Sequence, residues 1–484
     1  ERGLEFPVEI QEMYAVFFTS GSTGKPKGVM VTMQGALELI QYKLKTSRAA
    51  GVGIKTLQFC HLGFDISVKE IFVSLCSGGE LHLIEEKNRL DAYFMVNYVQ
   101  NQGINTLFLP NVSLQYFTNT AVVSGIFPSS LIEVNTGGEQ LQITPHVREF
   151  FKNIPDAILK NNYGPTEASM WASELDLTGD PESWEEIPSI GKPMPGYGFI
   201  ILDSAMYPVA PGQIGELHIY GNCLAKGYLN REDLTQTRFV NWKSPEGQGI
   251  RVYKTGDLVQ LTQNGHYYFH GREDDQIKIR GNRVELGEIE SALVNLPNIK
   301  HAIVKLDTDP SGLKYLCGYV LFTDPTKNDL SAIKNMLKAK VPEYMVPDYI
   351  LAVDEFPKTS SGKVDKKALP KPQNTRPEWA DSYVAPSSDL EKKITPIVTN
   401  ILNYDKVSIH DNFFELGGNS LKAQKVVSEL RQQLGLELPI IKLYQIPTIF
   451  QIAAYFGQES TIKQKKSSVP TKKSQEREVA IIGM

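Results

Sequence analysis

Residues 271–290 read GREDDQIKIRGNRVELGEIE, and the pattern of the chain changes at this stretch. Within it, 276–281 has the composition of a strand that ends in a turn, and 285–296 has the spacing of an amphipathic helix. On its N-terminal side, short β-branched runs such as 106–109 alternate with helical patterns, which indicates α/β layers. We therefore expect an α/β multidomain protein, with a larger α/β subdomain before this stretch and a small α+β subdomain beginning in it.

Beyond residue 370 the pattern changes twice more. A Pro-rich polar run predicts a linker, and the apolar residues after it recur at helical spacing, so an all-helical domain is expected. A stretch rich in Lys, Ser and Gln, with almost no large apolar residue, then predicts a second, flexible linker. The predicted parts are the larger subdomain 1–270, the small subdomain 271–370, the linker 371–386, the helical domain 387–457, the linker 458–477 and the start of another domain at 478–484.

The composition is that of an ordinary soluble globular protein. The chain has 484 residues, of which 41% are hydrophobic and 22% charged, and its formal net charge is −5. A slightly negative net charge does not indicate a nucleic-acid-binding protein. No apolar run reaches the roughly 18 residues of a membrane helix. The four cysteines are far apart and form no CxxC pair, which favours reduced thiols in a cytoplasmic protein. We expect neither nucleic acid nor a membrane as a partner.

A glycine- and hydroxyl-rich stretch at 19–28 reads TSGSTGKPKG. Small residues let the backbone approach phosphate oxygens closely, and Lys25 or Lys27 adds positive charge. The stretch is not a Walker A loop, because Pro26 stands where the helix of that motif would begin. Taken alone, the stretch is explained by an ordinary loop at least as well as by a phosphate site.

Seven further motifs follow the loop in order along the chain. Together the eight resemble the adenylate-forming superfamily and, within it, the adenylation domains of nonribosomal peptide synthetases. The resemblance implies the adenylate-forming fold with its N-terminal part missing, so residues 1–484 alone are expected to be unstable or inactive, with apolar faces left uncovered. The seven motifs lie at 64–67, 161–167, 215–230, 253–258, 271–290, 341–347 and 361–366.

The resemblance implies an ATP-dependent, AMP-forming ligase that joins a carboxylate to the α-phosphate of ATP. Such an in-line transfer needs charge neutralisation more than covalent help. The loop would hold the β- and γ-phosphates, Tyr163 would face adenine, and Asp257 would accept hydrogen bonds from the ribose hydroxyls. The implied ATP-binding residues are Thr19, Ser20, Gly21, Ser22, Thr23, Gly24, Lys25, Lys27, Asn161, Tyr163, Gly164, Asp257 and Arg272.

The resemblance implies three catalytic residues, Thr166, Glu167 and Lys363, and one hinge residue, Asp274. Glu167, beside Thr166, would hold Mg²⁺, since a hard cation takes oxygen ligands. Lys363 would bridge the substrate carboxylate and the nucleotide oxygens at the transition state. Asp274 matches the hinge about which the small subdomain would rotate between the two half-reactions.

The stretch 411–421 reads DNFFELGGNSL and resembles the phosphopantetheine attachment site of a peptidyl carrier protein, which is a four-helix bundle. Ser420 would carry a 4′-phosphopantetheine arm, added by a phosphopantetheinyl transferase, whose thiol attacks the adenylate. From the residues alone, Ser420 is equally an ordinary helix-capping serine. The tail 478–484 resembles the opening of a polyketide ketosynthase, which implies a hybrid peptide–polyketide synthase with neighbouring synthetase and ketosynthase modules as partners.

The resemblance also points to the amino-acid substrate. Asp65 stands where an anion would meet the α-ammonium group. Phe108, Met170 and Trp171 are bulky, which favours a small side chain such as that of glycine or alanine. Lys69 is discordant, and would either meet an acidic side chain or extend to solvent. The full set of implied pocket residues is Asp65, Ile66, Lys69, Phe108, Val134, Thr136, Asn162, Met170 and Trp171, with Thr136 where a glycine is often found.

Two alternatives stay open. The first is another acyl- or aryl-acid-activating ligase of the same superfamily fused to a carrier protein. The second is an inactive scaffold. Asp65 and the appended carrier motif favour the amino-acid-activating enzyme over the first alternative, and the presence of Thr166, Glu167, Asp257 and Lys363 argues against the second.

Overall fold

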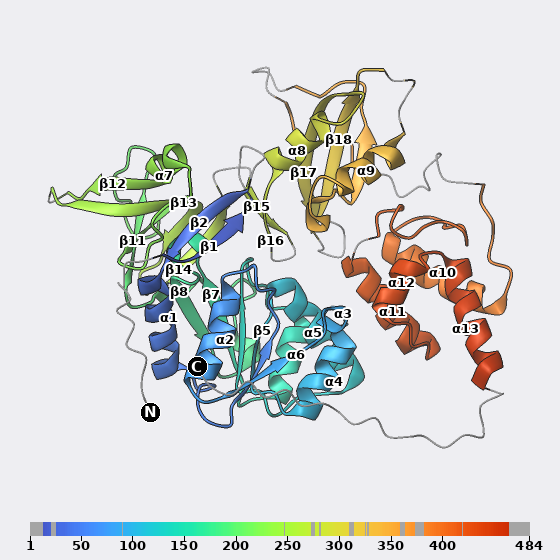
Figure 1. The fold of residues 1–484 in the computed structure, drawn as a ribbon, viewed down its shortest axis with the longest axis horizontal. Coiled ribbons are helices and arrows are strands. Elements are labelled where there is room, and N and C mark those ends of the chain that lie inside the picture. The colour runs from blue at the N-terminus through green and yellow to red at the C-terminus, as the bar shows by residue number, and fades with distance from the viewer. Residues whose placement is uncertain are drawn as a thin grey trace. The chain divides into compact units, whose positions relative to one another are not determined.

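The computed structural model shows two compact units, Glu1–Pro372 and Gln373–Met484 (Figure 1). No helix in the described part of the chain is long and apolar enough to cross a membrane. The structure describes residues 13–20, 26–89, 91–245, 247–272, 276–279, 282–308, 314–324, 326, 329–358, 364–372, 382–418 and 420–463.

A seven-stranded sheet forms the centre of the first unit, in the order β4-β3-β5-β6-β7-β8-β9. The strands β4, β3, β5, β6 and β7 run parallel, so their carboxyl ends meet at one edge, whereas β8 pairs antiparallel with β7 and with β9. The bounds are β3 Lys55–Gln58, β4 Glu80–Leu83, β5 Thr106–Phe108, β6 Glu133–Gly137, β7 Ile158–Tyr163, β8 Ser173–Leu177 and β9 Lys192–Pro193.

Helices cover both faces of this sheet (Figure 1). Helices α1 (Met33–Thr46) and α2 (Ile66–Cys76) pack with Phe108 and Trp171 in one hydrophobic core. On the opposite face, α4 (Ala92–Gln102), α5 (Asn111–Ser124) and α6 (Pro145–Asn153) pack on the aliphatic side chains of β3, β5, β6 and β7. The short α3 (Glu86–Arg89) precedes α4. The alternation of the strands therefore divides their side chains between two distinct cores.

Two antiparallel sheets complete the larger subdomain. One is the hairpin of β1 (Met13–Thr19) and β2 (Lys27–Thr32). The other has the order β10-β11-β13-β12, with β14 also pairing with β13. Its elements are β10 Tyr197–Leu202, β11 Ile214–Gly221, α7 Glu232–Arg238, β12 Phe239–Lys243, β13 Gly249–Leu261 and β14 Tyr267–Arg272, and the 3-10 turns are η1 Thr166–Ala168 and η2 Pro181–Ser183.

The small subdomain has the predicted α+β composition. Strand β14 ends at Arg272, two residues beyond the predicted boundary, because it still pairs with β13. The predicted helix over 285–296 is observed as α8, and β15 supplies the predicted strand. The elements are β15 Gln276–Ile279, β16 Asn282–Glu285, α8 Leu286–Val294, β17 Ile299–Thr308, β18 Lys314–Phe322, α9 Leu330–Lys338, η3 Glu343–Met345 and β19 Tyr349–Ala352.

The second unit is helical in its described residues, with one shared hydrophobic core. Ser388 and Glu391 form a capping box that starts the first helix. The last helix includes residues 458–463, so this part of the predicted linker is helical, since extending an existing helix adds backbone hydrogen bonds without a new nucleation step. The helices are α10 Asp389–Leu402, α11 Ser420–Leu434, α12 Ile440–Gln445 and α13 Ile449–Lys463.

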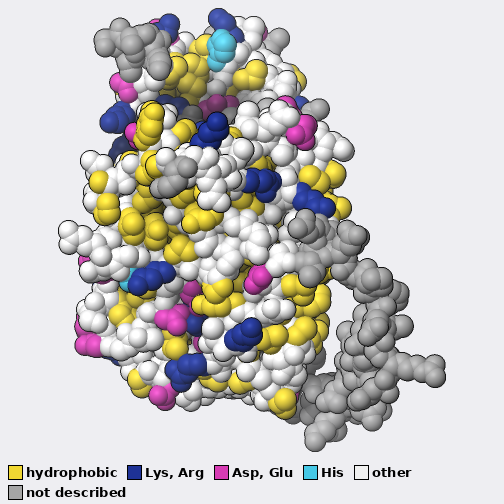
Figure 2. Space-filling view, turned by 90° about the vertical axis from the view of Figure 1, so that its left-hand side faces the viewer, with side chains coloured by type: hydrophobic (Ala, Val, Ile, Leu, Met, Phe, Trp, Pro, Cys, Tyr) yellow, Lys and Arg dark blue, Asp and Glu magenta, His cyan; other side chains and the backbone are white. Residues whose placement is uncertain are grey.

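The surface carries both charged and apolar side chains. On the face drawn in Figure 2, basic and acidic groups are scattered among apolar and neutral ones. Phe18, Val52 and Leu62 are exposed apolar residues of the first unit. Single exposed apolar side chains are common on protein surfaces, so these residues carry no functional assignment by themselves.

Candidate active site

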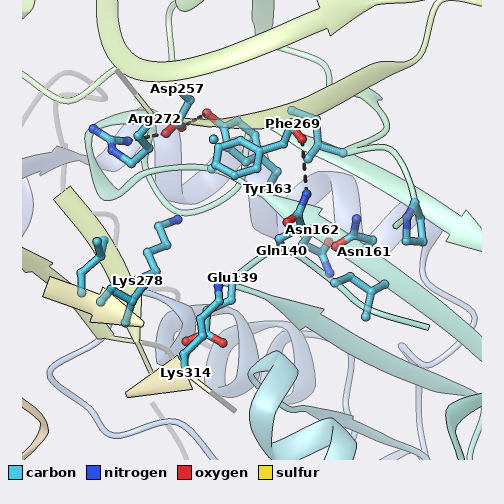
Figure 3. Close-up of a pocket in the computed structure, with 18 residues that line it drawn as sticks. Glu139, Gln140, Asn161, Asn162, Tyr163, Asp257, Phe269, Arg272, Lys278 and Lys314 are labelled. Atoms are coloured by element: carbon cyan, nitrogen blue, oxygen red, sulfur yellow. Dashed lines mark hydrogen bonds and ion pairs between the residues drawn. The ribbon is translucent and has the colours of Figure 1, made fainter. Parts of the chain in front are cut away.

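A cavity of about 300 Å³ lies where the central sheet, the β10–β14 sheet and the small subdomain meet (Figure 3). Crevices at the carboxyl ends of parallel strands are the usual ligand sites of α/β sheets. The cavity brings together five of the residues predicted to bind ATP: Asn161, Tyr163, Gly164, Asp257 and Arg272.

Asp257 is the centre of a buried network on one wall of this cavity. The Tyr163 hydroxyl donates to Asp257 Oδ2 over 2.5 Å, and Arg272 Nη1 forms an ion pair with Asp257 Oδ1. Arg272 Nη2 also donates to the Thr255 carbonyl over 3.0 Å. Burial, together with the neighbouring Asp257 carboxylate, raises the pKa of Tyr163 well above its usual range, so Tyr163 stays a neutral donor. The network holds a carboxylate in place with lone pairs left for further hydroxyl donors.

Gly164 is required by the close approach of two backbone segments. A Cβ atom on Gly164 would lie 2.5 Å from the Met170 carbonyl oxygen and 2.7 Å from the Ala172 nitrogen. These are backbone atoms, so a side-chain rotation cannot relieve the clash.

Replacing Gly164 with alanine is expected to lower the free energy of unfolding by about 1–3 kcal/mol, the usual cost of overpacking, and to displace Tyr163. Thermal unfolding of the two proteins measures the effect. Gly318→Ala is the matched control, since its added Cβ would meet side-chain atoms only, the nearest at 3.4 Å. Equal unfolding temperatures for the two variants would contradict the argument.

Glu167 lies fully buried beside the end of the predicted phosphate loop. The Tyr228 hydroxyl donates to Glu167 Oε1 over 2.7 Å, and the Lys27 ammonium lies 3.2 Å from the same oxygen. An oxygen donor of this kind fits Mg²⁺, which takes one or two protein carboxylates and fills its shell with waters and phosphate oxygens. No cluster of three His, Cys, Asp or Glu residues suited to a metal occurs in the described residues. The Glu167 carboxylate is thus one oxygen ligand that could hold the ion.

Several predicted residues lie outside the described part of the chain. Thr19 ends β1, and Ser20 is buried directly after it. Ser420 is the first residue of α11, so it stands at a helix start as predicted from its glycine-rich approach. The residues that lie outside the described ranges are Gly21, Ser22, Thr23, Gly24, Lys25, Asp274 and Lys363.

The start of α2 places the predicted amino-acid contacts. Asp65 immediately precedes the helix. Burial raises the pKa of the Asp65 carboxyl above its usual value, although a hydrogen bond from the Thr166 hydroxyl acts in the opposite direction by favouring the charged form. Ile66 is half-buried. Lys69 is only 4% exposed, so the expectation that it extends to solvent is wrong. Its ammonium lies 5.8 Å from the Trp171 ring centroid, and this ring lies 5.9 Å from that of Phe108.

The strand register corrects two of the predicted pocket residues. Phe108 pairs with Asn135, and Gly137 pairs with Asn162, so these four side-chain positions share the face that α1 and α2 cover. Val134 and Thr136 alternate to the opposite face, and Val134 packs in the core beneath α4, α5 and α6. The register therefore places Val134 and Thr136 on the face of the sheet opposite to Phe108 and Asn162, with which they were predicted to line one pocket.

Sequence reasoning did not assign Tyr228 or Lys278. Tyr228 binds Glu167, and Lys278 lines the cavity from β15 (Figure 3). Both residues belong to motifs on which the resemblance rests. The contacts of Tyr228 and Lys278 exist because β2 lies against residues 227–229 and β15 lies at the cavity. The spacing of residues along the chain does not reveal such contacts.

Three protein families match successive parts of the chain. The AMP-binding enzyme family matches residues 4–229, the AMP-binding enzyme C-terminal domain matches 288–363, and the phosphopantetheine attachment site matches 392–456.

Similar proteins extend this pattern over nearly the whole chain. Tyrocidine synthase 2 of Brevibacillus parabrevis is 36% identical over 93% of the chain, which spans only 12% of that protein's length. A solved protein with nonribosomal peptide synthetase adenylation and PCP domains, bound to a vinylsulfonamide inhibitor, shares the fold with a TM-score of 0.75 at 24% identity, over 95% of this chain and 76% of its own. A four-domain nonribosomal peptide synthetase solved with AMP and glycine is 31% identical with a TM-score of 0.50, over 94% of this chain and 32% of its own. The chain therefore contains an AMP-binding enzyme domain, its C-terminal domain and a phosphopantetheine attachment domain, and its homologues are adenylation and carrier proteins of nonribosomal peptide synthetases.

Proposed function

We propose that this protein activates an α-amino acid with ATP and loads it as a thioester onto its own carrier domain. In the first step a carboxylate oxygen of the amino acid attacks the α-phosphorus of ATP, and pyrophosphate leaves. In the second step the thiol of phosphopantetheine on Ser420 attacks the acyl carbon, AMP leaves, and the thiol proton is released. The observation that carries the proposal is the cavity that unites Tyr163, Asp257 and Arg272 in one chain with a carrier domain.

Different residues have different roles in the first step, the formation of the adenylate. Asp257, held by Tyr163 and Arg272, accepts hydrogen bonds from the ribose and so fixes the nucleotide. Lys27 pairs with Glu167, and its charge would neutralise phosphate oxygens of the bound nucleotide. Mg²⁺ held by Glu167 would supply further neutralisation of phosphate charge. Lys363 is assigned to the transition state by the resemblance alone.

Two features support an amino acid as the acid that is activated. Asp65 supplies a carboxylate at the start of α2, where an α-ammonium group needs an anion. The similar four-domain synthetase was solved with glycine. Phe108, Met170 and Trp171 are all buried, so the room for a side chain is small, and by size alone glycine or alanine fits.

The wider context of the protein is part of the same proposal. The tail at 478–484 resembles a ketosynthase opening and lies outside the described residues. We place the protein in a hybrid peptide–polyketide synthase, where a phosphopantetheinyl transferase and neighbouring modules are its partners. We also propose that the domain boundaries predicted from the sequence are those of the adenylation, carrier and ketosynthase domains of this synthase.

Amino-acid-dependent exchange between ATP and labelled pyrophosphate tests the proposal. The full-length gene product is assayed with all common amino acids and with several hydroxy and aryl acids. Exchange with one or a few small amino acids is expected. Exchange with aryl or fatty acids alone would assign the protein to the acid-activating ligases instead and would remove the role given to Asp65.

A further inference from the structure

Asp257, the residue assigned to the ribose, lies in an irregular part of strand β13. Residues 255–257 of β13 lie opposite the single residue Leu217 of β11, because the pairing register shifts there. These residues form a bulge, and Gly256 in its middle has a left-handed backbone with φ of +74°. Bulges are common beside active sites, where they redirect a side chain. This bulge places Asp257 on the wall of the nucleotide cavity (Figure 3).

Two side chains accept hydrogen bonds from the backbone N–H groups of this bulge. Glu216 Oε1 accepts from the Gly256 N–H over 3.0 Å. Thr255 Oγ1 accepts from the Asp257 N–H over 3.0 Å, and the same hydroxyl donates to the Leu217 carbonyl over 2.6 Å. A bulge interrupts the regular ladder between strands, and a buried N–H group without an acceptor is costly. The two side chains therefore fix the shape of the bulge.

The bulge is also tied to the cation that holds the Asp257 carboxylate. Arg272 Nη2 donates to the Thr255 carbonyl over 3.0 Å, and Arg272 Nη1 forms the ion pair with Asp257 Oδ1. Because Arg272 contacts both the backbone of the bulge and the carboxylate, a change in the shape of the bulge would move the two together. The direction of the carboxylate therefore depends on the bulge as well as on the hydrogen bond from Tyr163.

The neighbours of Glu216 indicate that its acceptor oxygen matters more than its charge. His218 Nδ1 lies 3.1 Å from the Glu216 carbonyl, which only accepts, so Nδ1 is the donor. Burial lowers the pKa of His218, so the ring is neutral at pH 7 and Nε2 carries a lone pair. Nε2 lies 3.7 Å from Glu216 Oε2 and has no hydrogen-bond partner among the described residues. The Lys254 ammonium lies 3.9 Å from Oε2 on a side chain that is one-third exposed, and such pairs contribute little.

Resting on the ribose contact of the proposed function, we propose that Glu216 is a positioning residue for ribose recognition. Its Oε1 holds the Gly256 N–H, and the bulge so fixed directs the Asp257 carboxylate toward the ribose hydroxyls. Glu216 supplies an acceptor oxygen at this place, and its negative charge is not required. A site built to hydrogen-bond hydroxyl groups rejects the analogue that lacks them. Glu216 therefore contributes to the preference of the cavity for a ribonucleotide over its dideoxy analogue.

The first test compares the binding of two nucleotides. Titration calorimetry with Mg²⁺ and without amino acid gives the Kd of the full-length gene product for ATP and for 2′,3′-dideoxyATP. The unaltered protein is expected to bind ATP about 10- to 100-fold more tightly, and Glu216→Ala to lower this ratio by about 10-fold, the effect of hydrogen bonds to a charged group. Glu185→Ala is the matched control, because Glu185 accepts from the Tyr268 hydroxyl on the neighbouring strand β14 over 2.8 Å, away from the bulge. This control is expected to leave the ratio unchanged.

The outcomes separate the inference from the proposed function. If the unaltered protein binds the two nucleotides equally well, the ribose contact of the proposed function is overturned, and the inference with it. A full preference for ATP in Glu216→Ala overturns the inference and leaves the proposed function standing. Equal weakening for both nucleotides, with the ratio unchanged, would show a purely structural role of Glu216 and would also overturn the inference.

The second test removes the charge of Glu216 and keeps an acceptor. In Glu216→Gln the amide oxygen can still accept from the Gly256 N–H, and the amide nitrogen can donate to the lone pair of His218 Nε2. The ratio of the two Kd values is expected to stay within about 2-fold of that of the unaltered protein, since the hydrogen bond is retained. Loss of the preference for ATP in Glu216→Gln would assign the effect to the charge and contradict the inference, even where Glu216→Ala does not fold.

Discussion

Replacing Ser420 with alanine is expected to abolish aminoacyl-thioester formation completely and to leave amino-acid-dependent pyrophosphate exchange unchanged. The hydroxyl of Ser420 is the atom to which the resemblance attaches phosphopantetheine, and without that arm no thiol is available to attack the adenylate. In the proposed function the adenylation half-reaction uses the cavity in the first unit, and all the residues that line this cavity belong to that unit. Mass spectrometry of the intact protein after treatment with a phosphopantetheinyl transferase and coenzyme A measures the loss.

Ser428→Ala is the matched control for this prediction. Ser428 lies on the same helix, α11, and only accepts a hydrogen bond from Gln432 Nε2 at the surface. It is expected to load normally. Retention of the phosphopantetheine mass in Ser420→Ala would place the attachment elsewhere and would remove the role given to Ser420.

Changing Asp257 to asparagine is expected to lower kcat/KM for ATP by about 100-fold, the loss of one or two charge-assisted hydrogen bonds. Asparagine has the same shape, but it ends the ion pair with Arg272 on the cavity wall. Its amide also replaces one of the two acceptor oxygens that the ribose hydroxyls would use. Pyrophosphate exchange at varied ATP concentration measures the effect.

Asp233→Asn controls for the loss of an aspartate charge. Asp233 pairs with Arg231 at the surface, on the edge of α7, and its change is expected to leave exchange unaltered, because exposed ion pairs contribute little. If Asp257→Asn bound and used ATP as well as Asp233→Asn, the nucleotide would have to contact some other wall of the cavity.

The grouping of Tyr163, Asp257 and Arg272 around one cavity could be expected from the sequence because the motifs that contain them are long and ordered. Tyr163, Asp257 and Arg272 come from separate stretches, yet the structure brings them within hydrogen-bonding contact. The α+β character of the small subdomain followed in the same way from the change of pattern after residue 270. Such assignments depend on residue type and order, which the sequence contains directly.

The faces on which the predicted pocket residues lie could not be read from the sequence, because they depend on strand register. A shift of one residue in a β-strand moves a side chain to the opposite face, and the structure places Val134 and Phe108 on opposite faces of the sheet. The burial of the Lys69 side chain also could not be predicted from the sequence, because it depends on how α2 packs against the sheet and not on the neighbouring residues in the chain.

Direct detection of the aminoacyl thioester tests the central claim most directly. The full-length gene product, converted to its phosphopantetheine form, is incubated with ATP, Mg²⁺ and the amino acid preferred in exchange, and the peptide that contains Ser420 is analysed by mass spectrometry. The account predicts that this peptide gains the phosphopantetheine arm plus one aminoacyl group, that the aminoacyl mass requires ATP, and that hydroxylamine removes it. A phosphopantetheine-bearing peptide that never acquires the aminoacyl mass, in a protein that does catalyse exchange, would contradict the claim that the adenylation and carrier domains of this chain act on one substrate.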